Sequence, residues 1–423
     1  MALALIIFLA TYAALLIFPK IRAYIALGSA ALFIILGILP IGKVFFAVDW
    51  NVIMMIAGTM GIVHLFIESK MPSLLADIII KRMPNVKWVI IALSLFAGLI
   101  SAFVDNVATV LMVAPVALVV AEKLKISPVP AIIAIAISSN LQGAATLVGD
   151  TTSILLGGYA NMDFLDFFFY QNRPGLFFVV QAGAILSAAT LMVVFRSYGQ
   201  KIKMQGETVV EDYFPTFLLC GTVLLLILAS FLPEKPQITN GLICVSLLII
   251  GLVRESIRSG RVKETVAAAV KEIDHFTLLL LAGLFIVIAG ITEAGVVEEI
   301  AKVFVKISGN NLFAIYSLLV WASVLFSAFI DNIPYIATML PVTAGIAAHM
   351  GVDPTILYFG LLSGATLGGN LTPIGASANI TALGILRKNG HTATTGQFMK
   401  ISVPFTLTAV TTGYILIWLF WGI

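Results

Sequence analysis

The fold of this chain is decided by two similar segments, SAFVDNVATVLMVAPV at residues 101–116 and SAFIDNIPYIATMLPV at residues 327–342. Seven of the sixteen aligned positions are identical, and three more exchange Val for Ile. The same register, which aligns position 101 with position 327, continues without a gap into a second block, where Gly143, Thr146 and Gly149 lie opposite Gly369, Thr372 and Gly375. Because these residue types are retained in one register, the pattern predicts an internal duplication.

The composition predicts an all-α polytopic membrane protein. Of 423 residues, 60% are hydrophobic and only 11% are charged, whereas soluble domains carry about 25% charged residues. Apolar runs of about 20 residues, long enough to cross a bilayer as a helix, recur along the chain. The net charge of +3 comes from loop lysines and arginines and does not indicate a nucleic-acid partner.

Each duplicated block interrupts an apolar stretch with Asp and Asn. The arms around Asp105-Asn106 are short for full spans, so we expect a re-entrant hairpin over 88–121 with this pair at its tip. The next helix, 129–158, is expected to cross the membrane and to break between Gly143 and Gly149. The second half repeats this plan with a hairpin over 312–348, tipped by Asp331-Asn332, and a broken helix over 355–386.

Ten spans complete the expected topology. They are placed at 2–19, 22–41, 51–68, 129–158, 174–195, 213–232, 238–253, 275–292, 355–386 and 401–421. With both termini outside the inner membrane, nineteen of the 24 Lys and Arg residues face the cytoplasm, in line with the positive-inside rule. Five spans per half make the repeats inverted. We divide the chain into a first repeat at 1–200, a cytoplasmic linker at 201–212 and a second repeat at 213–423.

Three carboxylates are expected deep in the membrane: Asp105, Asp150 and Asp331. An intramembrane ionisable group is costly and by default marks an ion or substrate path. The alternative is that each Asp only caps a half-helix, although both roles can hold together. No Lys or Arg is expected at the same depth.

Neutral oxygen and amide groups accompany these carboxylates. Hairpin tips and helix breaks offer half-helix ends and free carbonyls, and hard cations prefer oxygen ligands. We therefore predict a Na⁺ site at Asp105, Asn106, Asp331 and Asn332. The wider transport site would add Asn140, Thr146, Ser153, Asn370, Thr372, Ser377 and Asn379. The alternative for the Asn and Thr residues is hydrogen bonding between helices.

The glycines of the matched blocks also have two interpretations. Gly143, Gly149, Gly369 and Gly375 either permit broken backbone or let helices approach closely, and their place beside polar residues favours the first. His64 and Glu68 lie one helical turn apart and would suit a proton relay or a plain interfacial position. A nucleotide-binding loop and a metal-spaced Cys/His cluster are absent from the sequence, so we expect neither an enzyme nor a bound cofactor.

The two duplicated segments, together with GAATLVGD at 143–150 and GNLTPIGASAN at 369–379, resemble the ion transporter superfamily. The branch in question holds arsenite efflux permeases, silicic-acid exporters, Na⁺/H⁺ antiporters and the melanosomal P protein. The resemblance implies a scaffold that often forms homodimers, a transport domain that moves like an elevator, and a site built by the tips and broken helices. Related dicarboxylate transporters carry Ser-Asn-Thr at the tips, where this chain has Asp-Asn-Val and Asp-Asn-Ile. The branch often has Pro-Pro-Asn where this chain has Thr151-Thr152-Ser153.

The expected function is secondary active transport that exchanges H⁺ or Na⁺ for a small inorganic solute. A cation, or a neutral acid such as arsenous or silicic acid, suits a site whose fixed charges are all acidic. The alternative is Na⁺-coupled uptake of a carboxylate, with ions neutralising the aspartates. A channel suits two inverted hairpins less well, and no nucleophile–base pair of an intramembrane enzyme is visible.

Overall fold

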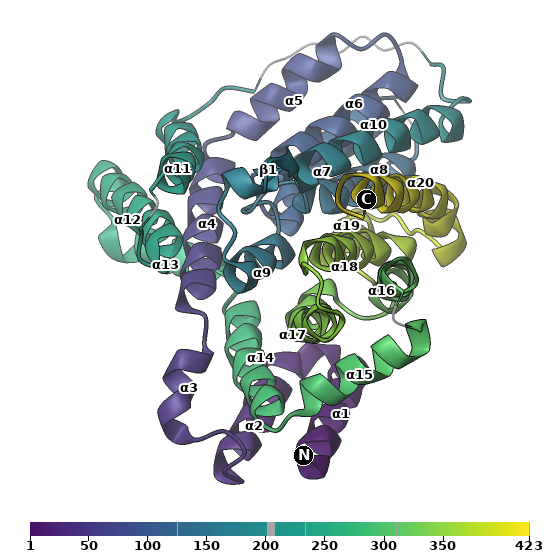
Figure 1. Cartoon of the computed structure of the whole chain (residues 1–423). Coiled ribbons are helices and arrows are strands. Elements are labelled where there is room, and N and C mark those ends of the chain that lie inside the picture. Colours follow the sequence, from purple (N-terminus) through teal and green to yellow (C-terminus); the bar gives the residue numbers. More distant parts are fainter. Residues whose placement is uncertain (125, 201–207, 233, 310, 423) are drawn as a thin grey trace.

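The computed structural model describes residues 1–423 except 125, 201–207, 233, 310 and 423. The described chain is almost entirely helical (Figure 1). Part of the expected linker, 201–207, lies outside the described residues. The first half contains α1 Ala2–Ile17, η1 Pro19–Ile21, α2 Arg22–Ile35, α3 Ile41–Ala47, α4 Trp50–Glu68, α5 Met71–Lys81, α6 Val86–Ser101, α7 Asn106–Leu124, α8 Val129–Gly143, α9 Thr151–Ala160, η2 Leu165–Phe167, β1 Phe169–Tyr170, β2 Arg173–Pro174 and α10 Leu176–Val194.

The second half repeats this order of helices. It contains α11 Phe214–Ser230, α12 Thr239–Ser259, α13 Val262–Glu272, α14 His275–Glu293, α15 Val296–Ser308, α16 Leu312–Ser327, α17 Asn332–Met350, α18 Thr355–Gly368, η3 Gly369–Leu371, α19 Ser377–Lys388 and α20 Thr395–Trp421. Helices α16 to α19 begin at the positions that the register of the duplication aligns with the first residues of α6 to α9. The short strands β1 and β2 pair antiparallel, Phe169 opposite Pro174.

The chain has the apolar helices of a multi-pass membrane protein. Within the described residues, seven helices are long and apolar enough to span a bilayer: α4, α7, α10, α12, α14, α17 and α20. The expected spans at 2–19, 22–41 and 213–232 appear as shorter apolar helices. The second of these stops at Ile35 because Gly37 adopts a φ of 66°, a left-handed conformation, and Pro40 follows.

The helices pack into two groups that are visible in Figure 1. One group, here called the scaffold, holds α1–α4 and α11–α14, and the other, here called the transport body, holds α6–α10 and α16–α20. Within the scaffold, helices cross between halves: α4 packs against α12, and α14 packs against α2. Helices α5 and α15 contact both groups and connect them along the chain.

Small residues set the close packing inside the scaffold. A Cβ atom on Gly58 would lie 2.6 Å from the carbonyl carbon of Cys244, and one on Gly283 would lie 2.7 Å from that of Ala26. The two contacts correspond in the repeat: Gly58 lets α4 pack closely against α12, and Gly283 lets α14 pack closely against α2. Small residues at such crossings let helix backbones approach closely in a membrane.

Candidate functional site

The two hairpin tips are turns between apolar helices, and each is capped by its aspartate. Asp105 lies between α6 and α7, and its Oδ1 accepts the backbone N–H groups of Val107 at 3.0 Å and Ala108 at 3.2 Å. Asp331 lies between α16 and α17, and its Oδ1 accepts the N–H of Ile333 at 3.1 Å. Capping satisfies backbone donors that the start of a helix leaves free, so both tips are fixed in the same way.

Each helix break packs directly against the tip of its own half. The hydroxyl of Thr146 donates to the carbonyl of Ala102, and the hydroxyl of Thr372 donates to the carbonyl of Ala328. A Cβ on Gly149 would lie 2.7 Å from the oxygen of Gly143 and 3.0 Å from those of Ser101 and Ala102. The second half has the same crowding, because a Cβ on Gly375 would lie 2.6 Å from the oxygen of Gly369 and 2.8 Å from those of Ser327 and Ala328. Glycine is therefore required at both positions by close backbone approach.

Two further polar side chains satisfy the broken backbone. Ser153 donates its hydroxyl to the carbonyl of Gly143 at 3.0 Å. Its counterpart Asn379 donates its amide to the carbonyls of Gly369 at 3.0 Å and Thr372 at 3.1 Å. Backbone groups at membrane depth require such partners, and these two residues supply them.

Asparagines join the two halves at the centre of the transport body. Asn140 accepts the amide of Asn106 at 2.9 Å, and its own amide donates to the carbonyl of Thr366 at 2.7 Å and to Oδ1 of Asn370 at 3.1 Å. The amide of Asn370 in turn donates to the carbonyl of Ile137 at 2.9 Å. These bonds connect the first tip, α8, α18 and η3 into one network.

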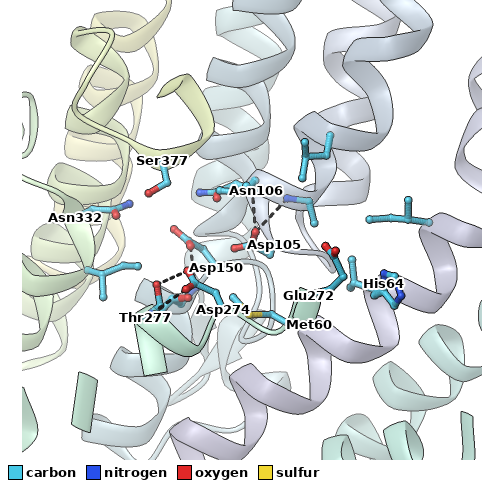
Figure 2. A pocket seen from close by; sticks show the side chains of 17 residues that line it. Met60, His64, Asp105, Asn106, Asp150, Glu272, Asp274, Thr277, Asn332 and Ser377 are labelled. Atoms are coloured by element: carbon cyan, nitrogen blue, oxygen red, sulfur yellow. Dashed lines mark hydrogen bonds between the residues drawn. The ribbon is translucent and has the colours of Figure 1, made fainter. Parts of the chain in front are cut away.

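A cavity of about 160 Å³ lies where the transport body meets the scaffold (Figure 2). Its body side carries residues from both tips and from the starts of α9 and α19: Asp105, Asn106, Val107, Ala108, Leu111, Asp150, Thr151, Asn332, Ile333 and Ser377. Its scaffold side carries Met60, Val63, His64, Ile67, Glu272, Asp274 and Thr277. The two halves of the chain therefore share one cavity. We call it the tip cavity.

The charged groups that line the tip cavity are acidic. They are Asp105, Asp150, Glu272 and Asp274, and among the described lining residues there is neither Lys nor Arg. The ring nitrogen Nε2 of His64 lies 3.7 Å from Oε1 of Glu68, and His64 also faces the cavity. A cleft lined with one sign of charge concentrates ions of the opposite sign, so the cavity favours cations.

Five of the predicted site residues line the tip cavity: Asp105, Asn106, Asp150, Asn332 and Ser377. Asp331, a member of the predicted Na⁺ site, is not among the lining residues. The remaining ten predicted residues lie in or beside the helix breaks behind the cavity, where they hold backbone in place: Asn140, Gly143, Thr146, Gly149, Ser153, Gly369, Asn370, Thr372, Gly375 and Asn379. The sequence pattern does not point to Glu272, Asp274 or Thr277. Their polar surroundings along the chain look like an ordinary solvated loop, and only the packing of α14 brings them to the tips.

The expectation of no deep basic residue is wrong. Nη1 of Arg22, the first residue of α2, lies 2.5 Å from Oδ2 of Asp331, and the two side chains are only 17% and 15% exposed. The hydroxyl of Ser377 also donates to this Oδ2 at 3.3 Å. The expected topology places Arg22 at the cytoplasmic end of the span 22–41, but in the structure the second hairpin tip reaches the start of α2. Asp331 is therefore neutralised by a fixed cation, whereas Asp105 has no ion-pair partner in the part of the chain that the structure describes.

A polytopic helical chain whose interrupted helices meet at a polar cavity has the architecture of a membrane transporter. A family comparison agrees with this architecture. Residues 12–364 match the CitMHS family, which is described as a family of citrate transporters. The chain belongs to this family. Because the family lies within the ion transporter superfamily, the resemblance stated above is confirmed.

Relatives and solved structures extend the match over nearly the whole chain. An uncharacterised transporter of Mycobacterium tuberculosis is 32% identical, over 98% of this chain and 97% of the relative. The P protein of Homo sapiens is 26% identical, over 86% of this chain and 53% of that protein. The YdaH transporter of Alcanivorax borkumensis shares the fold with a TM-score of 0.62 at 15% identity, over 90% of this chain and 87% of that one. MtrF of Neisseria gonorrhoeae, described among antimetabolite efflux pumps, gives 0.53 at 17% identity, over 88% and 81%.

Proposed function

We propose that this transporter is a secondary active carrier that exchanges H⁺ or Na⁺ for a small solute through the tip cavity. The observation that carries the proposal is the lining of this cavity, to which both hairpin tips contribute residues and which contains four carboxylates but, among the described lining residues, no Lys or Arg. Carboxylates in such a place bind a cation or a proton in turn, which is the elementary step of coupled exchange.

The solute class that fits this lining is a monovalent cation or a neutral hydroxy-acid of a metalloid, such as arsenous or silicic acid. Both avoid the repulsion that a bare anion would meet beside Asp105 and Asp150. The amides of Asn106 and Asn332 and the hydroxyls of Thr151 and Ser377 supply hydrogen-bonding groups for either.

The second candidate is uptake of a carboxylate such as citrate, and the description of the family favours it. A carboxylate would enter this acidic cavity only together with cations that neutralise the aspartates. Transport of the anion would then depend steeply on the cation, which separates this candidate from the first.

The proposed mechanism is elevator-like, with the transport body moving against the scaffold. The two-group packing supports it, because α6–α10 and α16–α20 pack with one another and carry the polar tips, while α2 and α12 pack within the scaffold. We place the protein in the inner membrane with both termini outside, which turns the tip cavity toward the cytoplasm. A homodimer of scaffolds would give the body a fixed surface to slide along.

Purified protein in liposomes tests the proposal. We would follow internal pH while adding Na⁺, Li⁺, arsenite, silicate, citrate or dicarboxylates one at a time, with empty liposomes and Asp105→Asn as controls. A proton signal for a cation or a metalloid acid that is lost in Asp105→Asn supports exchange. A signal only for citrate or a dicarboxylate, and only with Na⁺ present, would favour the second candidate.

A further inference from the structure

A second cavity, of about 630 Å³, lies between the scaffold and the transport body around Asp49. Its lining includes Asp49, Phe285, Ala289 and Thr292 from the scaffold, and Gly158 and Ala337 from the body. It has no lining residue in common with the tip cavity. We call it the Asp49 cavity.

The scaffold wall of the Asp49 cavity is the repeat counterpart of the wall of the tip cavity. Helix α4 begins at Trp50 and α14 at His275, and these first residues correspond in the repeat. Asp49 and Asp274 precede them as caps, each accepting a backbone N–H at 3.0 Å. In this register, the four α4 residues of the tip cavity map onto four α14 residues of the Asp49 cavity: Phe285, Ile288, Ala289 and Thr292. The cap Asp274 maps onto Asp49 itself.

The two cavities meet the transport body at different positions along α9. The tip cavity reaches the tips and the start of α9 at Asp150 and Thr151. The Asp49 cavity meets the same helix further along, where a Cβ on Gly158 would lie only 2.6 Å from Oδ2 of Asp49. The stretch of helix from Thr151 to Gly158 corresponds to roughly 10 Å along α9. A slide of that order would carry the tips from one cavity to the other.

The partner of Asp331 also has a repeat counterpart. Because Gly58 contacts Cys244 as Gly283 contacts Ala26, position 26 of α2 corresponds to position 244 of α12. In the same register, position 22 corresponds to Asn240. This residue is only 7% exposed, lines a cavity that also contains Asp49, and its Oδ1 has no hydrogen-bond partner among the described residues.

We propose that the Asp49 cavity is the second position of the solute site, in which Asp331 leaves Arg22 and lies beside Asp49 while Asp105 withdraws to Asn240. The inference rests on the proposed function for its ligand, a cation or small polar solute. Each half of the chain supplies the contacts that the other half makes in the opposite state, as inverted repeats do in alternating access. Arg22 is then a positioning residue, which holds Asp331 in one state through their ion pair.

The two positions are not equivalent in charge. At the tip cavity, Asp150 and Glu272 add two carboxylates, but their counterparts at the second position are Ala376 and Ala47. The lining of the Asp49 cavity also contains Glu293, but this carboxylate is paired with Lys43 at 2.8 Å. Beyond that ion pair, the second position offers a cation Asp331 and Asp49. Fewer carboxylates bind a cation more weakly, so the solute site releases cations more readily on the Asp49 side.

Cysteine crosslinking tests the proposal in proteoliposomes. After replacement of Cys220 and Cys244 by Ala, one variant carries Arg22→Cys with Asp331→Cys, and its repeat counterpart carries Asn240→Cys with Asp105→Cys. We expect both pairs to react with a short bifunctional thiol reagent, the second only when the body has moved. Absence of the second crosslink at both low and high Na⁺ would overturn the proposal. The single-cysteine variants serve as controls.

A second pair keeps the test independent of damage at the tips. Asp274→Cys with Gly384→Cys reproduces in the second half the contact of Asp49 with Gly158, and a Cβ on Gly384 would meet nothing within 4 Å in the described state. This crosslink is expected in the folded protein, as judged by a single elution peak. Its absence in a folded variant would contradict the slide.

The role of Arg22 has its own readout. Arg22→Gln should raise the rate of the Asp274–Gly384 crosslink by about fivefold, because it removes a largely buried ion pair from the described state. Lys20→Gln, an exposed neighbour, is the matched control and should leave the rate unchanged. Equal rates in the two variants would overturn the role of Arg22. Neither crosslink requires transport of a solute. If the crosslinks show that the body moves but no solute is transported, the proposed function is refuted, whereas the second position of the body is still supported.

Discussion

At the scale of single residues, Asp150 shows how one side chain serves both the fold and the cavity. Its Oδ1 accepts the N–H of Thr151 at 2.8 Å, and its Oδ2 accepts the hydroxyl of Thr152 at 2.9 Å. The same carboxylate lines the tip cavity. Its counterpart Ala376 lacks these functions, and α19 begins there without a side-chain cap. The chemistry of the first half is therefore not repeated in full.

Asp150→Asn should separate the two roles of this residue. The amide oxygen retains the cap on α9, so the thermal unfolding midpoint in detergent should change little, whereas loss of the charge should reduce cation-dependent flux by about tenfold or more. Asp150→Ala should lose the cap as well, at a cost of about 1 kcal/mol. Normal flux in Asp150→Asn would show that this carboxylate only caps the helix.

Gly149→Ala should destabilise the protein through overpacking. The added methyl group would meet three backbone oxygens at 2.7–3.0 Å, and backbone cannot move aside as a flexible side chain does. We expect a loss of about 1–3 kcal/mol, with the same direction in Gly375→Ala. Gly28→Ala is the control, because a Cβ there meets nothing within 4 Å. Thermal unfolding in detergent measures the stability of all three variants. Equal midpoints would contradict the close packing of each helix break against its hairpin tip.

At the scale of elements, the network between α8 and α18 holds the two halves of the body together. Both helices are almost wholly buried. The amides of Asn140 and Asn370 therefore cannot exchange these hydrogen bonds for hydrogen bonds to bulk water. Removing one partner of a buried hydrogen bond leaves the other unsatisfied, which costs more than the bond contributes. The network is therefore expected to behave as a unit.

A double-mutant cycle measures this coupling. Asn140→Ala and Asn370→Ala should each lower the free energy of unfolding by about 1–3 kcal/mol, and the double variant should lose clearly less than the sum. Asn389→Ala is the control, because Asn389 is exposed and its side chain donates to the nearby carbonyl of Ile385 at the end of α19. Strict additivity would contradict a shared network.

The elements were largely predictable from the sequence. The hairpin expected at 88–121 corresponds to α6 and α7, and the broken helix expected at 129–158 corresponds to α8 and α9. The expected short arms are wrong for α7 and α17, because these helices of 19 residues are long and apolar enough to span a bilayer. Polar pairs and glycines inside apolar runs mark these interruptions locally. The ion pair of Arg22 with Asp331 and the place of Asp274 were not predictable, because residues so distant along the chain meet only through packing between the scaffold and the body.

At the scale of the whole molecule, the two groups of helices meet around a cavity that neither half builds alone (Figure 2). The first half supplies Asp105 and Asn106, and the second half supplies Asn332 and Ser377. The repeat that is visible in the sequence thus places two tips, one from each half of the chain, around one space. The central claim of this account is that the transported solute passes through that space.

A crosslink between the two tips tests this claim most directly. In a background without Cys220 and Cys244, the pair Asn106→Cys and Asn332→Cys should react with a short bifunctional thiol reagent, because both positions line the tip cavity. With a cleavable reagent, the solute flux found in the liposome screen should stop on crosslinking and return on reduction, while each single-cysteine variant keeps its own flux. Failure of the pair to crosslink, or undiminished flux in the crosslinked protein, would contradict the account.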